Sequence, residues 1–466
     1  MKYYFPEMEE LILSAITVNY LSGGEGVMGV NYALLSLNAP VVPGQEELVA
    51  RTHSILLRPE DYALLNQSVR AIGVSERFED VIKTFSVPRG EIPAGFRIES
   101  SLKNDGLLMI DLVRDISYDK NGMKRPTGVI FSADSANPYE VAPIAPLLGN
   151  LTCNPGIVYD LFINNPKANV GGKFKTREEV MQELGRILGS GVDISVELNN
   201  PFEKDFNKIL EECEQFKELL SEYRLVVKVP HTGPVNAENV HELLEGDKRF
   251  PIRYDEAATA DALMGHNLAL RLRDHGYRIN YTLMFEPYQT ALALQAKPYF
   301  INSFVRHRQS QTASFKKLLD LYERTGERVY LETIRKEMLQ ADYLRKNEIE
   351  RDLLDVYKLA GDIVRYRNAD NDEGSDGLDS VRHNLRLLRN NHLRDTRLII
   401  CSMEGAYNYP DIDRLMADPA YKDVIDRVVI TAEPGYLARF TSTNQVVSYQ
   451  RRFMNAVNND NNDKNK

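Results

Sequence analysis

The chain has 466 residues, of which 43% are hydrophobic and 27% are charged, and its formal net charge is −10. These values are typical of a globular protein with more than one domain, and the acidic balance argues against nucleic acid or an anionic membrane as the main partner. Its three cysteines, Cys153, Cys213 and Cys401, are too few for a disulfide framework and lack the spacing of metal ligands. The sequence shows no signal-peptide pattern and no apolar run that could span a bilayer, so we expect a soluble cytoplasmic protein.

Residues 1–126 mix helical and strand patterns and predict an α+β region of unknown role. A hairpin over residues 95–113 is predicted to turn at Asn104-Asp105-Gly106, because an Asp-Gly pair favours a tight turn between two strands. The predicted helices of this region span residues 6–21, 58–73 and 75–85.

From about residue 127, short apolar strands alternate with amphipathic helices, which is the pattern of βαβ units in a parallel sheet. Eight such units favour a closed (β/α)8 TIM barrel over residues 127–455. A helix over residues 176–188 is predicted to begin with a capping box formed by Thr176 and Glu179. The predicted strands span residues 127–134, 148–154, 192–199, 224–230, 278–285, 298–304, 396–403 and 426–432.

Two connections, residues 231–276 and 308–395, are longer than a minimal barrel needs. The second follows the sixth strand and predicts a charged, helical insertion. Within it, residues 368–380 resemble a calcium-binding loop only superficially, because the glycine has the wrong offset and the closing glutamate is absent. We therefore expect a solvated loop and no metal site. Residues 456–466 are rich in Asn and Asp and predict a disordered tail.

Lys228 stands inside the apolar run 224–230, which otherwise has the composition of a buried strand. Burying a lysine ammonium is unfavourable unless it is paired or gives up its proton. Lys228 is therefore an edge residue with its stem on the surface, half of a buried ion pair, or an amine used in chemistry. For the last case we expect apolar walls to lower the pKa of Lys228 and free the amine as a nucleophile.

Other polar side chains recur near the C-terminal ends of the predicted strands, where the active sites of barrels lie. Several are paired two residues apart and so project from one face of their strand. Asp134 alone could be a turn residue and Glu197 alone could make a structural ion pair, so their joint occurrence with Lys228 is what favours an active site. The side chains of this set are Asp134, Thr152, Asn154, Ser195, Glu197, Asn280, Thr282, Asn302 and Ser402.

With these residues in place, the sequence resembles the transaldolase family, within the class I aldolases that form a Schiff base. The resemblance covers about residues 127–440 and follows the order of the family's motifs, here "FSADSAN", "LTCNPGIV", "ISVEL", "VVKVP" and "INYTLMF" with "QTALALQAKPYFINSFV". It implies a barrel fold, with Lys228 as the Schiff-base nucleophile, Asp134 as the acid–base residue, and Glu197 acting through a water. It also implies a catalytic role for Thr282. The substrate-binding residues that it implies are Thr152, Asn154, Ser195, Asn280, Asn302, Phe304 and Ser402.

The sequence departs from the family where the substrate phosphate is bound. The resemblance implies one arginine after the sixth strand and another after the seventh. His307 occupies the first position, flanked by Arg306 and Arg308, and Glu404 occupies the second. A carboxylate there repels a phosphate dianion. Either a flanking arginine substitutes, or the substrate carries no phosphate at that end.

The leading hypothesis is a cytoplasmic transaldolase-type transferase of carbohydrate metabolism, as in the pentose phosphate pathway. It would move a dihydroxyacetone unit from a ketose or ketose phosphate to an aldehyde through Lys228, without a metal or cofactor. The resemblance implies that Glu197 and Phe304 favour transfer, because the family's simple aldolases have glutamine and tyrosine there. One alternative is an aldolase with a specialised or non-phosphorylated substrate. Another is a catalytically silent barrel that serves as a binding scaffold. The expected partner is a sugar or sugar phosphate, and a homo-oligomer is compatible with the sequence.

Overall fold

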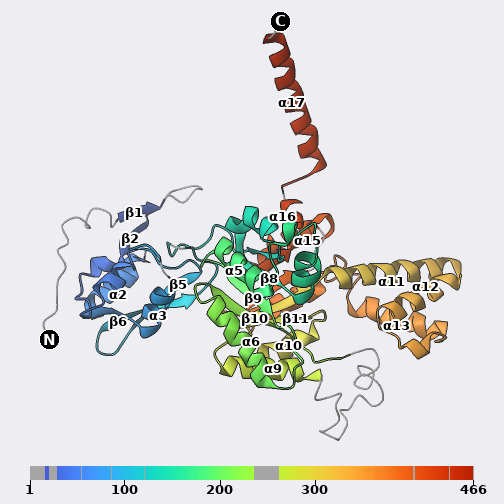
Figure 1. Cartoon of the computed structure of the whole chain (residues 1–466), viewed down its shortest axis with the longest axis horizontal. Coiled ribbons are helices and arrows are strands. Elements are labelled where there is room, and N and C mark those ends of the chain that lie inside the picture. The colour runs from blue at the N-terminus through green and yellow to red at the C-terminus, as the bar shows by residue number, and fades with distance from the viewer. Residues whose placement is uncertain are drawn as a thin grey trace.

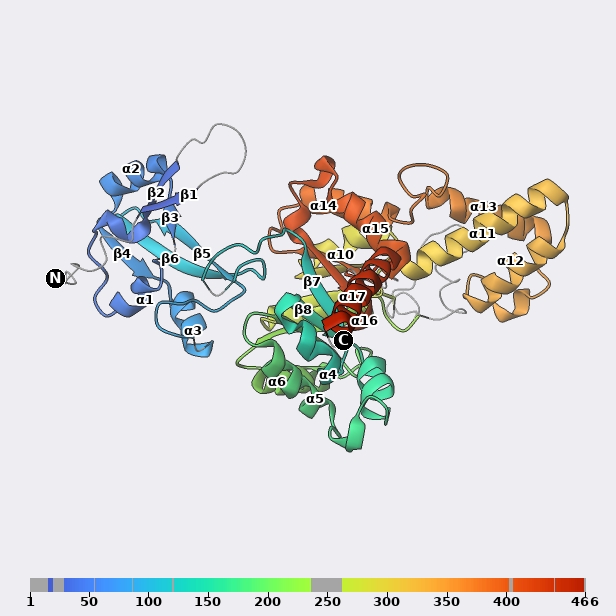
Figure 2. The ribbon, with the colours of Figure 1, turned by 90° about the horizontal axis from the view of Figure 1, so that it is seen from above.

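The computed structural model describes residues 16–19, 29–53, 55–85, 87–119, 121–235, 262–401, 405–439 and 441–464. In Figure 1 an N-terminal domain, a central barrel and a group of helices follow one another along the long axis of the molecule. Figure 2 shows the same order from above, with the N-terminal domain and the helices α11 to α13 on opposite sides of the barrel.

Eight parallel strands close the central barrel, and they pair in chain order from β7 to β14, with β14 returning to β7. Each lies within one of the eight segments predicted from the sequence, so the (β/α)8 prediction is confirmed. Short runs of β-branched and other apolar residues fill these strands, as expected for a sheet covered on both faces. The strands are β7 (Ile130–Asp134), β8 (Leu148–Cys153), β9 (Asp193–Glu197), β10 (Arg224–Pro230), β11 (Ile279–Thr282), β12 (Phe300–Phe304), β13 (Arg397–Cys401) and β14 (Val428–Ala432).

Helices surround the barrel and bury their apolar faces against the outer side of the strands. Helix α5 begins with the predicted capping box, in which Thr176 accepts from the backbone of Glu179 and the Glu179 carboxylate accepts in return. The helices are α4 (Pro138–Val141), α5 (Arg177–Leu188), α6 (Phe206–Leu219), α9 (Met264–Asp274), α10 (Tyr288–Gln295), α14 (Asp379–Arg389), α15 (Gly405–Met416) and α16 (Pro434–Arg439). Short 3₁₀ segments are η3 (Ala142–Leu147), η5 (Val170–Gly172), η7 (Pro419–Tyr421) and η8 (Ile425–Arg427), and η4 (Ile157–Ile163) is a π-helix.

The N-terminal domain contains two three-stranded sheets, β1-β2-β3 and β4-β6-β5. The predicted hairpin is confirmed as the antiparallel pair β5 and β6, and the helix over 75–85 is confirmed as α3. The helix over 58–73 ends early, because the apolar residues after Ser68 form β4, which pairs with β6. The elements are β1 (Ile16–Asn19), β2 (Gly29–Ala33), η2 (Leu34–Leu37), α1 (Glu46–Ala50), β3 (Leu56–Leu57), α2 (Pro59–Ser68), β4 (Ala71–Val74), α3 (Glu76–Thr84), β5 (Phe96–Leu102) and β6 (Leu107–Arg114).

A strand stands where the first predicted helix should end. Residues 16–19 read ITVN and form β1 against β2, so the prediction of a helix through residue 21 is wrong there. β-branched side chains such as those of Ile16 and Val18 favour the extended conformation, and sheet pairing overrides the helical pattern. Residues 6–15 of that predicted helix lie outside the described residues.

The predicted insertion after the sixth strand divides into two parts. Helices α11 (Arg306–Thr325), α12 (Val329–Gln340) and α13 (Leu353–Tyr366) pack around their own apolar core and extend away from the barrel, with η6 (Lys346–Glu348) between the last two (Figures 1 and 2). Helix α14 instead packs on β12 and β13. We call α11 to α13 the helical module. Only the module is an addition to the barrel; α14 serves as the covering helix between two strands.

The C-terminal part of the chain is helical where the sequence predicted disorder. Helix α17 (Asn444–Lys464) runs through the Asn- and Asp-rich segment and projects away from the barrel in Figure 1. No proline or glycine interrupts this segment, so nothing in it breaks the helix that begins before it. Among the described residues, no helix has both the length and the apolar composition needed to cross a bilayer.

Candidate active site

Strand pairing places the predicted site residues at one end of the barrel. Lys228 on β10 is paired with Glu197 on β9 and with Asn280 on β11. Asp134 on β7 is paired with Thr152 on β8. These residues end or nearly end their strands, so they meet at the C-terminal face, where barrels carry their active sites.

Lys228 is 6% exposed and makes a buried ion pair. Its Nζ lies 3.1 Å from Oε2 of Glu197 and 3.5 Å from the carbonyl oxygen of Cys153. Burial lowers the pKa of Lys228, but the carboxylates of Glu197 and Asp134 outweigh it, and the net pKa lies above the ordinary value. The expectation that apolar walls lower this pKa is therefore wrong for the resting site. The amine rests as an ammonium and must pass a proton to a neighbour before it can attack a carbonyl.

Asp134 also has a raised pKa, so this carboxyl group holds its proton to a higher pH than an ordinary aspartate does. Its Oδ1 is enclosed and has no hydrogen-bond partner among the described residues. Burial raises the pKa of Asp134 to about 6; Lys228 opposes this shift, and Glu433 and Glu197 add to it. A carboxyl group with a pKa near neutrality can both take up and return a proton during turnover.

A ladder of hydrogen-bonded side chains crosses the barrel interior one step below Lys228. Asn150 donates to Ser132 (2.9 Å), and Ser195 donates to Asn150 (3.3 Å). Asn280 donates to Ser195 (3.0 Å), and Asn302 donates to Asn280 (2.7 Å). All five are buried, so the ladder forms a rigid polar base for the site. The sequence argument missed Ser132 and Asn150, although each lies two residues before a predicted site residue and shares its strand face.

Thr152 and Thr282 are buried at the ends of their strands, and Asn154 follows β8. The hydroxyl of Thr152 has no hydrogen-bond partner among the described residues, so it is available to a ligand. The Asn154 side chain accepts from the backbone of Ile157 (2.9 Å), so this side chain also orders the turn into η4.

The ends of β12 and β13 close the site with an aromatic side chain and a thiol. Phe304 packs on Phe285, with ring centroids 4.9 Å apart. Cys401, which the sequence argument did not select, belongs to the interior cluster of the barrel and donates to the carbonyl of Ser303 (3.3 Å). Burial raises the pKa of the Cys401 thiol, so the thiol stays neutral. Ser402 was predicted at this strand end and lies outside the described residues, as does Glu404.

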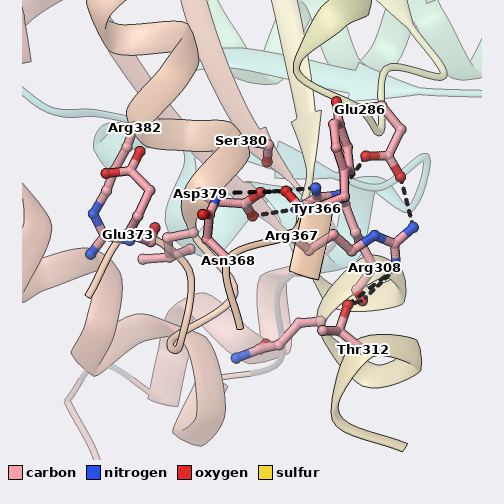
Figure 3. Close-up of polar contacts among 12 residues, drawn as sticks. Glu286, Arg308, Thr312, Tyr366, Arg367, Asn368, Glu373, Asp379, Ser380 and Arg382 are labelled. Atoms are coloured by element: carbon pink, nitrogen blue, oxygen red, sulfur yellow. Dashed lines mark hydrogen bonds and ion pairs between the residues drawn. The ribbon is translucent and has the colours of Figure 1, made fainter. Parts of the chain in front are cut away.

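Arg308, predicted as a substitute phosphate ligand, is already fully used inside the protein (Figure 3). It is 2% exposed and donates to Glu286 (2.9 Å) and, through two nitrogens, to the buried carboxylate of Asp379. Arg367 at the end of α13 donates to the same Glu286 (2.7 Å). This network fixes the helical module to the barrel and engages all three nitrogens of Arg308 with two carboxylates, so its charge is already paired. Arg306 and His307 are exposed on the first turn of α11.

The fold and the site together define an aldolase-type barrel enzyme, with one buried lysine between two carboxylates. Within the described ranges, no three His, Cys, Asp or Glu side chains gather in a way that could hold a metal ion. Residues 131–335 match the family model described as transaldolase/fructose-6-phosphate aldolase. This match confirms the resemblance over residues 131–335 and is consistent with a divergent member of that family. The matched range runs from β7 into α12, so the N-terminal domain and the last two strands lie outside it. No curated protein matches the chain.

Proposed function

We propose that this protein transfers a dihydroxyacetone unit from a ketose to an aldehyde through a Schiff base on Lys228. The observation that carries the proposal is the buried pair of Lys228 and Glu197, 3.1 Å apart, with Asp134 close enough to influence the lysine pKa. A structural ion pair would not need a second carboxylate, Asp134, whose Oδ1 lacks a hydrogen-bond partner among the described residues. The family match supports aldolase-type chemistry for the barrel.

The proposed reaction begins with a proton transfer from the Lys228 ammonium to Glu197. The neutral amine then adds to the ketose carbonyl, and the protonated Glu197 supports the loss of water to give the Schiff base. Asp134 takes the proton of the substrate hydroxyl next to the bond that breaks, and the aldehyde leaves. The enamine left on Lys228 adds to a second aldehyde, and Asp134 returns its proton to the new hydroxyl group. Water then hydrolyses the resulting Schiff base, which releases the new ketose and regenerates the Lys228 amine. A pKa of about 6 leaves Asp134 mostly ionised at neutral pH and thus ready to act as the base.

The saturation of Arg308 supports a second candidate, an aldolase or transferase with a non-phosphorylated substrate. Glu286 and Asp379 occupy the guanidinium of Arg308, so it offers no positive charge to a phosphate. A hollow of about 190 Å³ lies here, and its lining includes Arg308 itself with Glu286, His307, Gln311, Tyr343 and Arg367. Both arginines of this lining are paired with Glu286, so the hollow suits hydroxyl groups better than a dianion.

Reductive trapping tests the lysine chemistry. The protein is incubated with fructose 6-phosphate or with fructose, reduced with borohydride and weighed by intact mass spectrometry. We expect a covalent adduct that is lost in Lys228→Ala and kept in the matched surface variant Lys204→Ala. The absence of an adduct with either sugar, or an adduct that survives Lys228→Ala, contradicts the proposal. Glyceraldehyde added to fructose 6-phosphate, or glyceraldehyde 3-phosphate added to fructose, then separates transfer from simple cleavage. The acceptor differs in each case from the aldehyde that the donor releases, so only a transferase forms a new ketose in proportion to donor consumed. A strong preference for the phosphorylated sugar contradicts the second candidate.

A further inference from the structure

The N-terminal face of the barrel, which we call the barrel floor, carries a second cluster of charged side chains. Asp193 at the start of β9 accepts from Arg114 of the N-terminal domain (2.9 Å) and from Arg224 at the start of β10 (3.2 Å). Arg397 at the start of β13 pairs with Asp115. These bonds dock the N-terminal domain on the barrel at the end opposite Lys228.

Cations and carboxylates are closely packed in this cluster. Arg97, Arg114, Arg224 and Arg397 pair with the carboxylates of Asp115 and Asp193, and Arg97 also pairs with Glu99 and Asp395. Arg224 Nη2, Arg397 Nε, the hydroxyl of Tyr299 and the acceptor Asp193 Oδ2 are buried with no partner among the described residues. Burial and the nearby Arg114 lower the pKa of Arg224 to about 9 in spite of Asp193. The excess of positive charge therefore lies beside this cluster and not within it.

An open hollow of about 410 Å³ adjoins this cluster, and Tyr299 lines both. Its other charged or titratable lining groups are Arg273, Tyr277, Arg278, Lys297, His392, Arg394 and Asp395. The only carboxylate of this lining, Asp395, already accepts from Arg97 (3.3 Å).

Three cations of the hollow have no side-chain partner within the described part of the chain. The side chains of Arg278, Lys297 and Arg394 make no hydrogen bond or ion pair with a described residue. Repulsion from Arg114, together with burial, lowers the pKa of Arg278 to about 10. Most other arginines of this acidic protein have carboxylate partners, so unpaired cations around one concavity indicate a site for an anion.

We propose that the hollow at the barrel floor binds a small phosphate-bearing anion. Phosphate oxygens supply acceptors and negative charge to the unpaired cations of the hollow, and Arg278 and Arg394 can bind them in a bidentate manner. Arg278 precedes β11 and Arg394 precedes β13, so a bound anion joins the starts of two barrel strands. It also reduces the repulsion between Arg278 and Arg114, the arginine that docks the N-terminal domain on the barrel. The bound form is therefore more stable than the free form.

Calorimetric titration of the full-length protein with inorganic orthophosphate and pyrophosphate tests this proposal. We expect saturable binding of at least one of them at low ionic strength, and a rise in melting temperature with ligand concentration. The double variant Arg278→Gln/Arg394→Gln should weaken binding at least tenfold. The control Arg324→Gln/Arg328→Gln removes two charges from the exposed surface of the helical module and should change binding less than twofold. Trapping of sugar on Lys228 in the absence of phosphate should be the same in all three proteins. The proposal is overturned if neither phosphate binds below about 10 mM, or if the Arg278/Arg394 variant binds as tightly as the unmodified protein.

Discussion

Replacing Asp134 with asparagine should make the protein more stable at neutral pH while removing most of its activity. Asparagine has the shape of a protonated aspartic acid but carries no charge. The pKa of Asp134 is raised from an ordinary 3.8 to about 6, chiefly by burial. A difference of about 2 pKa units corresponds to about 3 kcal/mol, at about 1.4 kcal/mol per unit.

The direction in which stability changes with pH follows from proton binding. Between pH 4 and pH 6 the folded protein holds the Asp134 proton and the unfolded chain has lost it, so stability falls as pH rises through this window. Above pH 6 the folded state carries a buried carboxylate at the full cost of about 3 kcal/mol. The Asp134→Asn variant avoids this cost, so its gain should be about 3 kcal/mol at pH 7 and close to zero at pH 4. The loss of the base should slow turnover by about 10²- to 10⁴-fold.

Urea unfolding followed by circular dichroism, at several pH values between 4 and 8, measures this gain. The matched control is Asp320→Asn on the exposed surface of α11, where no pH-dependent gain is expected. A variant at position 134 that is less stable than the unmodified protein at pH 7 would refute the reasoning. So would a gain that does not shrink toward pH 4, because the effect would then come from packing and not from ionisation.

Three further predictions concern neighbouring parts of the molecule. Glu197→Gln should lower turnover by about 10²- to 10⁴-fold. It should also shift borohydride trapping on Lys228 to lower pH, because the lysine loses the carboxylate that raises its pKa most; an unchanged pH profile contradicts this. Gly265→Ala should destabilise the protein by about 1–3 kcal/mol in a thermal melt, because a Cβ there meets the carbonyl oxygens of the loop after β10. Asp379→Ala should lower the free energy of unfolding by about 3–5 kcal/mol, because buried Arg308 then keeps only one of its two carboxylate partners, Glu286. A melting temperature within 1 °C or so of the unmodified protein would contradict this stabilising role of Asp379.

The strands and the depth of the site could be predicted from the sequence, because both depend on local patterns. Apolar runs separated by amphipathic helices give the barrel, and alternation along each strand places Lys228 and Glu197 on the inner face. The same alternation fails on β13, where Arg397–Cys401 is apolar after its first residue and gives no sign of which face points inward. The inward-facing residue at the end of β13 is therefore Cys401, which the sequence pattern did not indicate.

Properties that depend on distant pairs could not be predicted. The sign of the Lys228 pKa shift depends on a 3.1 Å contact that a spacing argument cannot supply. Arg308 looked free because its partner Asp379 lies 71 residues further along the chain. The docking of the N-terminal domain depends on Arg114 and Asp193, which are 79 residues apart. In each case the chemistry of a charged group is set by a partner that only the fold brings close.

The two charged ends of the barrel are separated by layers that carry no net charge, so they should respond to substitution independently. Beneath Lys228 lies the neutral ladder of serine and asparagine side chains, and beneath that an apolar layer that includes Ile130, Val226 and Phe300. No hydrogen bond or ion pair joins Asp134 or Lys228 to Arg278 or Arg394 among the described residues, and effects at such distant sites usually add. Combining Asp134→Asn with the Arg278/Arg394 double variant should therefore give a stability change equal to the sum of the separate changes, within about 0.5 kcal/mol. A larger deviation in urea unfolding would show that the barrel floor and the catalytic end are energetically linked, and that an anion bound at the floor can influence the reaction at Lys228.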